Sequence, residues 1–212
     1  DLRVLLLASG ATREYRFLRN QLRRDDGMEV DVLLQSSPPG ISQDADAILS
    51  EFPTERDALN AYDCIVAFDP NWLALDVQQI ALLESWVSED AGGLIVVAGP
   101  VHGAVWLDSA EHKKLRDLYP VLFRRGLSIL GDGRYGSTTP WPLTFTREGM
   151  QADFLQLAET PAESEQVWEE FKGVFGYLAV KGAKPGAVVY ATSSDPEAKL
   201  GGGKPVYMAG QL

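Results

Sequence analysis

Short apolar segments in the N-terminal half of the chain constrain the fold more than any other feature. Residues 94–98 are a continuous apolar run, and residues 2–8 are one apart from Arg3. Runs of this length, bounded by turn residues, are typical of strands that are buried on both faces of a sheet. Residues 28–34 and 63–68 predict two further strands by their β-branched and apolar content.

Helical patterns separate these strands. Residues 12–25 predict a helix with Thr12 as its N-cap, and residues 54–60 predict a short one. Residues 76–89 predict a longer helix whose inner face consists of Val77, Ile80, Ala81, Leu83 and Val87. Strands that alternate with helices at this spacing form βαβ units with right-handed crossovers. We therefore expect an α/β fold with an open, mainly parallel sheet.

The C-terminal half carries weaker signals. Residues 109–119 and 161–171 predict helices, whereas the Gly- and Pro-rich residues 126–149 predict mostly loop. Three short strands follow, and the turns between them predict antiparallel additions to the sheet. No sharp change of composition marks a boundary, so we expect a single domain over residues 1–212. The three strands are predicted at residues 176–180, 187–192 and 205–209.

Charge and composition narrow the possible partners. The chain of 212 residues has a formal net charge of −11, and this excess of acid argues against nucleic-acid binding. No apolar run reaches 18 residues, so we expect no membrane insertion by this segment. The sequence starts at Asp1 and ends within a strand pattern, so we expect a fragment of a longer protein. Its partners would then be other domains of that protein or a separate protein.

Motifs spread over most of the chain together indicate a family. They are residues 14–18, Phe52-Pro53-Thr54, residues 62–66, residues 92–100, residues 143–149 and Lys184-Pro185-Gly186. As a set they resemble the class I glutamine amidotransferase-like domain of large bacterial membrane-anchored proteins, which is often joined to von Willebrand factor A-type regions. The resemblance implies a flavodoxin-like, three-layer α/β/α fold and an extracytoplasmic location.

The residues that such an amidotransferase needs for catalysis are missing. Active members place a nucleophilic cysteine on a sharp turn between a strand and a helix, and a later His and Glu activate it. The corresponding turn here, residues 97–101, contains no Cys, Ser or Thr, and no histidine follows residue 112. The one cysteine, Cys64, lies within a predicted strand, where we expect a buried structural thiol. The sequence thus predicts a domain that has lost this catalytic machinery.

Several polar or small residues should gather at the carboxyl edge of the sheet, where open α/β sheets bind ligands. These candidate ligand-binding residues are Ser9, Thr12, Asp69, Gly99 and His102. For each a structural role is the alternative: Thr12 as a helix cap, Asp69 as the start of a turn, and His102 as a loop residue. His112 lies in a charged run and is expected to be a solvated helix residue. The two histidines lack the spacing of a metal site, and we expect neither a metal nor a cofactor.

Two features are candidate partner surfaces. Leu82 and Trp86 are expected on the side of their helix opposite the inner face, covered either by a neighbouring segment or by a partner. Arg16, Arg19 and Arg23 form a basic stripe that is either solvated or docks on an acidic surface.

The leading hypothesis is a non-catalytic interaction or ligand-binding domain of a larger envelope-associated protein. One alternative is a hydrolase that uses Ser9 or His102 at the carboxyl edge, with further residues supplied from beyond the C-terminal end of this fragment. A further alternative is a carbohydrate-binding module in which Trp141 and Tyr135 stack on a sugar, and it requires both rings to be exposed.

Overall fold

A computed structural model describes residues 2–36, 44–123, 133–135, 137–196, 198–199 and 205–211. The chain divides into two compact units, Asp1–Leu118 (unit 1) and Tyr119–Leu212 (unit 2). Each unit is described by itself. No change of composition marks this division in the sequence, and the expectation of one domain over residues 1–212 stays a prediction.

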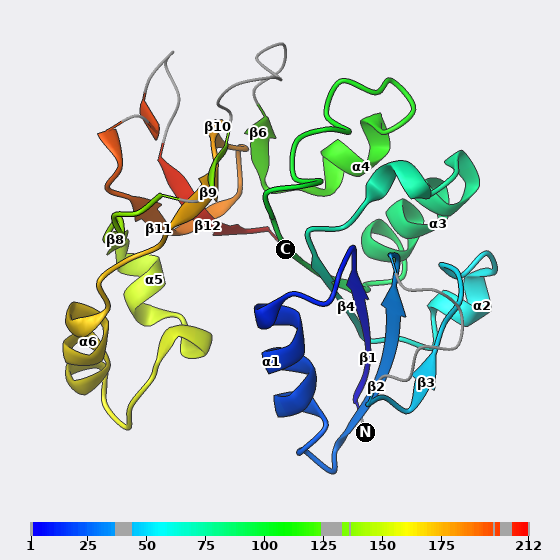
Figure 1. The fold of residues 1–212 in the computed structure, drawn as a ribbon, viewed down its shortest axis with the longest axis horizontal. Coiled ribbons are helices and arrows are strands. Elements are labelled where there is room, and N and C mark those ends of the chain that lie inside the picture. Colours follow the sequence, from blue (N-terminus) through cyan, green and yellow to red (C-terminus); the bar gives the residue numbers. More distant parts are fainter. Residues whose placement is uncertain are drawn as a thin grey trace. The chain divides into compact units, whose positions relative to one another are not determined.

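Unit 1 is built on a parallel sheet with the strand order β3-β2-β1-β4-β5 (Figure 1). Every neighbouring pair in this sheet is parallel. The predicted α/β fold with a mainly parallel sheet is therefore confirmed. Its elements are β1 (Leu2–Ala8), α1 (Arg13–Leu22), β2 (Met28–Leu34), β3 (Ala47–Ile48), α2 (Arg56–Leu59), β4 (Cys64–Phe68), η1 (Trp72–Ala74), α3 (Val77–Ser88), β5 (Gly93–Val97) and α4 (Lys113–Leu118).

Alternate residues of the central strands point to opposite faces of the sheet, and both faces are apolar. On one face Val4, Leu6 and Ala8 form a buried cluster with Tyr15 of α1 and with Phe68 of β4. The opposite face is formed by residues that are fully buried, and α2 and α3 lie on that side of the sheet (Figure 1). These residues are Leu5, Leu7, Ile65 and Ala67. Burial on both faces explains why β1 reads as an apolar run apart from Arg3.

Unit 2 is built from short antiparallel sheets, with the orders β12-β11-β8, β10-β6 and β7-β9 among the described strands. The predicted antiparallel pairing is confirmed. The described strands of unit 2 pair with one another, however, and are not the additions to the parallel sheet that the sequence predicted. Its elements are β6 (Val121–Phe123), β7 (Gly133–Tyr135), β8 (Leu143–Phe145), α5 (Arg147–Gln151), η2 (Asp153–Leu155), α6 (Pro161–Glu170), β9 (Gly176–Leu178), β10 (Val180–Ala183), β11 (Val188–Ser193) and β12 (Val206–Gly210).

Candidate functional site

The carboxyl edge of the parallel sheet is organised around Asp69, directly after β4. Asp69 is only 6% exposed and adopts a left-handed conformation with φ of 42°. Its Oδ2 accepts the backbone N–H of Val101 at 3.0 Å, and its Oδ1 accepts that of His102 at 2.8 Å. Both carboxylate oxygens therefore hold the turn that follows β5. Asp69 thus has a structural role here, although the turn that it holds is the one after β5 and not one that it starts itself.

Gly99 allows this turn to approach Asp69 closely. A Cβ atom at residue 99 would lie 2.3 Å from Cβ and 2.4 Å from Cγ of Asp69. Such distances are far inside van der Waals contact, so only glycine fits while the carboxylate keeps its place. The structure thus brings Asp69, Gly99 and His102 together as predicted, but His102 takes part through its main-chain N–H.

Ser9 and Thr12 lie after β1 and also have structural roles. The backbone N–H of Ser9 donates to the carbonyl of Phe68 at 3.2 Å, and its carbonyl accepts from Ser36 at 3.0 Å. Thr12 caps α1, because its Oγ1 accepts the N–H of Tyr15 at 3.3 Å. Within the described residues, no hydrogen bond joins the hydroxyl of Ser9 to the imidazole of His102. The geometry therefore offers no nucleophile–base pair to support the hydrolase alternative.

Cys64 lies within β4, as expected, but its side chain is half-buried and not fully buried. Burial, followed by the negative charge of Asp63, raises the pKa of the Cys64 thiol above its ordinary value. A thiol needs a lowered pKa to act as a nucleophile near neutral pH. The environment of Cys64 thus works against catalysis.

His112 corrects the prediction of a solvated histidine, since its side chain is only 4% exposed. Its Nε2 lies 2.9 Å from the carbonyl oxygen of Trp72, and its Nδ1 lies 2.8 Å from Oγ of Ser109. A carbonyl only accepts, so Nε2 carries a proton, and a neutral ring then accepts the Ser109 hydroxyl at Nδ1. The ring fastens the segment before α4 to η1. The charged neighbours in the sequence concealed this buried position.

Trp86 corrects the first candidate partner surface. The indole is 1% exposed and belongs to the buried face of α3 together with Ile80 and Leu83. The prediction put Val77 on the inner face, but Val77 is 57% exposed. The main chain at Gly92 lies directly against the Trp86 ring and covers it. A Cβ atom at residue 92 would lie 2.1 Å from that ring, so a larger residue could not approach as closely. The loop before β5 closes over Trp86, as the intramolecular reading expected, and Leu82 is half-buried.

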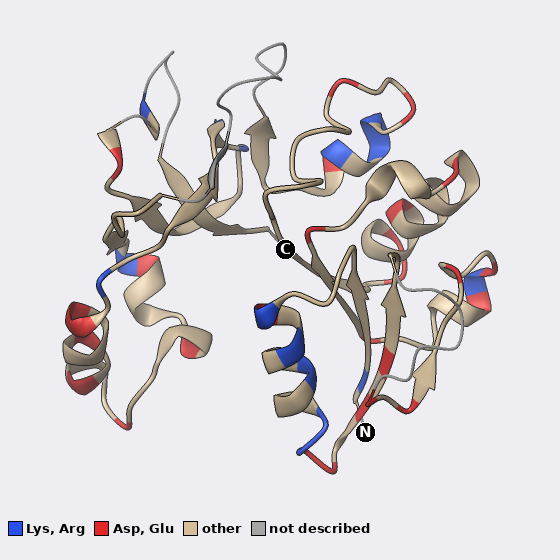
Figure 2. Ribbon diagram, in the orientation of Figure 1, with Lys and Arg blue, Asp and Glu red and all other residues tan. Residues whose placement is uncertain are grey.

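The basic stripe appears as blue segments along α1 (Figure 2), and part of it is engaged within unit 1. Arg23 pairs with Asp46 at 2.6 Å and with Asp44 at 3.8 Å. Arg19 lies over the ring of Tyr15, with its Cζ 5.8 Å from the ring centroid. Arg16 is exposed, and its Nε donates to the carbonyl of Thr12 at 3.4 Å. Because Arg23 has its own acidic partners, the stripe is a weaker docking surface than the sequence indicated.

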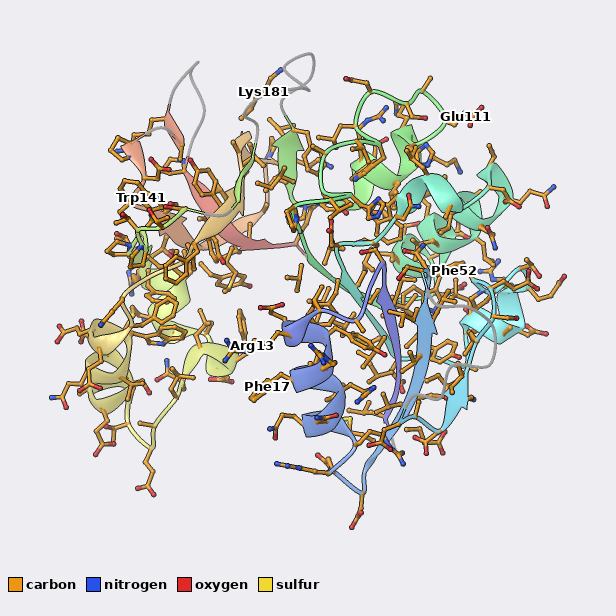
Figure 3. All side chains as sticks on the ribbon, viewed as in Figure 1. Arg13, Phe17, Phe52, Glu111, Trp141 and Lys181 are labelled. Carbon is orange, nitrogen blue, oxygen red and sulfur yellow. The ribbon has the colours of Figure 1, made fainter. Side chains whose placement is uncertain are left out.

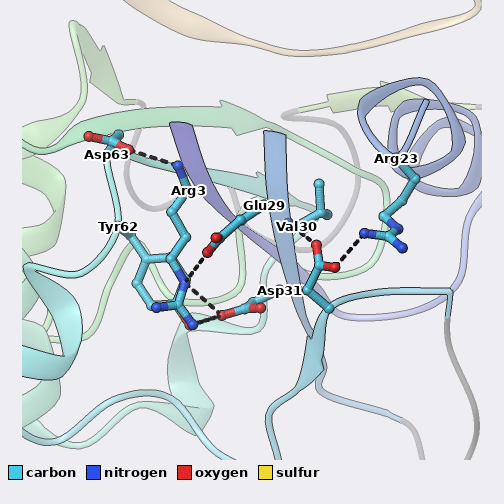
Figure 4. Close-up of polar contacts among 8 residues, drawn as sticks. Arg3, Arg23, Glu29, Val30, Asp31, Tyr62 and Asp63 are labelled. Atoms are coloured by element: carbon cyan, nitrogen blue, oxygen red, sulfur yellow. Dashed lines mark hydrogen bonds and ion pairs between the residues drawn. The ribbon is translucent and has the colours of Figure 1, made fainter. Parts of the chain in front are cut away.

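A polar cluster that the sequence reasoning missed lies at the sheet between β1 and β2 (Figure 4). Asp31 is 1% exposed, and its Oδ2 accepts from Arg3 Nη2 at 2.8 Å and from the Tyr62 hydroxyl at 2.7 Å. The bond to Asp31 raises the pKa of Arg3, and burial followed by that bond raises the pKa of Tyr62. The ion pair balances a buried charge in the sheet, and a structural role accounts for it. The available signal was Asp31 in the middle of a strand whose only other acidic residue, Glu29, lies near its start.

An apolar groove crosses the α1 face of the sheet. Its volume is about 390 Å³. Ile95 is 55% exposed and Val97 is 42% exposed, so the β5 side of this face is largely uncovered. The groove is lined by residues of α1, β1, β4 and β5, including Leu18, Leu22, Val4, Val66, Ile95 and Val97.

Trp141, which is labelled in Figure 3, lies in unit 2 and is half-buried. Its backbone forms an isolated antiparallel bridge with Val174. Its indole nitrogen is buried and has no hydrogen-bond partner in the described part of the chain. The side chain of Tyr135 lies outside the described residues, so the predicted stacking pair stays a prediction.

No group of three or more His, Cys, Asp or Glu residues in the described segments is placed to hold a metal ion. None of the helices among the described residues is long and apolar enough to cross a membrane. No protein-family model matches the chain, and no curated protein matches it either.

Proposed function

We propose that the chain is a non-catalytic interaction domain on a class I glutamine amidotransferase-like scaffold. The parallel sheet, with α1 on one side and α2 and α3 on the other, supports a flavodoxin-like, three-layer arrangement of this scaffold. Fold alone does not specify function, so the case depends on the carboxyl edge.

The observation that carries the proposal is the use of Asp69. Both of its carboxylate oxygens accept main-chain N–H groups of residues 101 and 102. A general base needs a free lone pair within hydrogen-bond reach of a nucleophile. At this edge the two bonds hold the Asp69 carboxylate against the turn after β5. In the described part of the chain, the hydroxyl of Ser9 is not hydrogen-bonded to the His102 ring. The polar residues thus stabilise the fold and supply no catalytic pair.

The apolar groove is the surface on which the interaction role depends. Its lining includes Ile95 and Val97, which expose about half of their side chains. An exposed, contiguous apolar face is the usual mark of a protein contact in a soluble domain. As part of this proposal, the domain belongs to a larger, envelope-associated bacterial protein, and its contacts are with protein.

Hydrolysis assays test the non-catalytic part of the proposal. The chain is incubated with glutamine and with p-nitrophenyl esters, beside the variants Ser9→Ala and His102→Ala. We expect turnover indistinguishable from buffer for all three proteins. Turnover by the unmodified chain that both variants abolish would establish the hydrolase alternative. Thr12→Ala, which changes a neighbouring hydroxyl that caps α1, is the matched control for an indirect loss of fold.

A further inference from the structure

The outer edge of β5 has no strand partner in the part of the chain that the structure describes. β5 is last in the strand order and, among the described strands, pairs with β4 alone. The N–H of Gly93 donates to the carbonyl of Asp63 at 3.0 Å, and the carbonyl of Val97 accepts from Asp69 at 2.8 Å. Residues of a strand alternate in direction, so the main-chain groups of Leu94 and Val96 point to the open edge.

Nothing in the sequence of β5 protects this edge. Its residues are Gly-Leu-Ile-Val-Val, without a charge or a proline, and its pairing with β4 runs without a bulge. Proteins normally shield an edge strand with Lys, Pro, a bulge or a covering segment. The side chain of Ile95 is 55% exposed beside the apolar groove, so the face next to the edge is uncovered as well.

We propose that β5 pairs antiparallel with β5 of a second copy of this chain, across a two-fold axis at Ile95. This inference rests on the proposed interaction function and names its partner. Leu94 of each copy then lies opposite Val96 of the other, and each such pair exchanges two N–H···O bonds. The two Ile95 side chains meet at the axis, with Cβ atoms about 5 Å apart. They extend the apolar face of the groove across both copies.

The distribution of charge favours a second copy as the occupant. In the two-fold register Asp90 lies opposite Pro100, and Glu89 lies opposite Val101, so no two charges face each other along the seam. Like charges directly opposite would destabilise a strand pair. In a two-fold contact both copies use the same surface. The main-chain groups of Leu94 and Val96 in each copy then pair with those of the other copy. The net charge of −11 is spread over the whole chain, and its repulsion between two copies is screened by salt.

Sedimentation velocity and light scattering on the whole chain test the proposal. At about 100 μM, far above a micromolar Kd, we expect a dimer that added salt strengthens. Ile95→Lys places two ammonium groups at the axis and should raise the dimer Kd at least about tenfold. Val77→Lys changes an equally exposed valine on α3 and should leave the dimer intact. Circular dichroism checks that both variants fold.

Hydrogen exchange identifies the strand. The amides of Leu94 and Val96 should be protected in the dimer and exchange fast in Ile95→Lys, whereas the Ile95 amide, which faces β4, should stay protected in both. A monomer at about 100 μM, a dimer that Ile95→Lys leaves unchanged, or a dimer with fast exchange at Leu94 and Val96 would overturn the proposal. These outcomes are separate from the hydrolysis assay, since turnover would refute the non-catalytic function without changing the state of association.

Discussion

Replacing Asp69 by Asn should destabilise unit 1 while leaving its shape almost unchanged. The carboxylate uses one oxygen for the N–H of Val101 and the other for that of His102. An amide keeps a single acceptor oxygen, so one N–H loses its partner and faces an NH₂ group. A hydrogen bond to a charged group contributes about 1.5–3 kcal/mol, and an orphaned buried donor costs about 1–3 kcal/mol. The lost bond and the unpaired donor are partly the same loss, so the two energies are not simply added. We expect the free energy of unfolding to fall by roughly 3 kcal/mol.

Asp76→Asn is the matched control. The N-cap of α3 also accepts two N–H groups, from Gln78 and Gln79, but both bonds go to Oδ1. A single amide oxygen can accept both, and Asn and Asp are about equally good N-caps. Losing the charge near the helix N-terminus costs about 0.3–1 kcal/mol. Both variants remove one negative charge, so their difference of about 2 kcal/mol isolates the second oxygen of Asp69.

Urea unfolding measures both variants. With a slope near 2 kcal/mol/M, Asp69→Asn should lower the midpoint by roughly 1–2 M, and Asp76→Asn by less than about 0.5 M. Tryptophan fluorescence follows unit 1 through the buried Trp72, Trp86 and Trp106. Hydrogen exchange in residues 97–103 gives a local measurement. Equal midpoints for the two variants would refute the reasoning that Asp69 holds the turn with both oxygens.

Three further outcomes follow from the structure. His112→Ala should lower the free energy of unfolding, measured in urea, by about 2–4 kcal/mol, because this ring is buried and hydrogen-bonded through both nitrogens. His102→Ala is the control and should change the free energy of unfolding by less than about 0.5 kcal/mol. Two hydrogen bonds to the Asp46 carboxylate lower its pKa. The larger effect comes from the backbone N–H of Val30 and the smaller one from the side chain of Arg23. The Asp46 carboxylate therefore stabilises the fold above the ordinary Asp pKa of about 4 and less as the pH falls, so Asp46→Asn should flatten the acid limb of a stability–pH curve. Cys64, whose thiol pKa is raised, should react with a thiol reagent at least about tenfold more slowly in the native chain than in urea. Equal rates would contradict the claim that its surroundings suppress the thiolate.

The parallel half of the fold was predictable because its signals are local. The predicted strands at residues 2–8 and 28–34 coincide with β1 and β2, since both segments are buried and bounded by turns. The N-cap at Thr12 was predicted as well. The predicted inner face of α3 was partly wrong, since it left out Trp86. Trp86 is covered by Gly92, which follows the helix, and the periodicity of the helix itself carries no sign of that contact.

The second half depends on contacts between residues far apart in the sequence. Gly149 was counted as a loop signal, yet it lies in α5, where a Cβ would be 2.0 Å from the carbonyl oxygen of Tyr190. The pairing of β8 with β11 joins residues more than forty positions apart, and a three-residue strand carries little periodic signal. His112 was misplaced for a similar reason, since its burial depends on Trp72.

Covalent labelling of the whole chain tests the absence of a catalytic nucleophile most directly. The chain is exposed to a serine-reactive fluorophosphonate and to a cysteine-directed glutamine analogue, and intact mass spectrometry measures the adducts. We predict no stoichiometric adduct with either reagent in the folded chain. In the described part of the chain no hydrogen bond joins Ser9 to the His102 ring, and the thiol pKa of Cys64 is raised. A single adduct at Ser9 or Cys64 that disappears in His102→Ala would contradict the account.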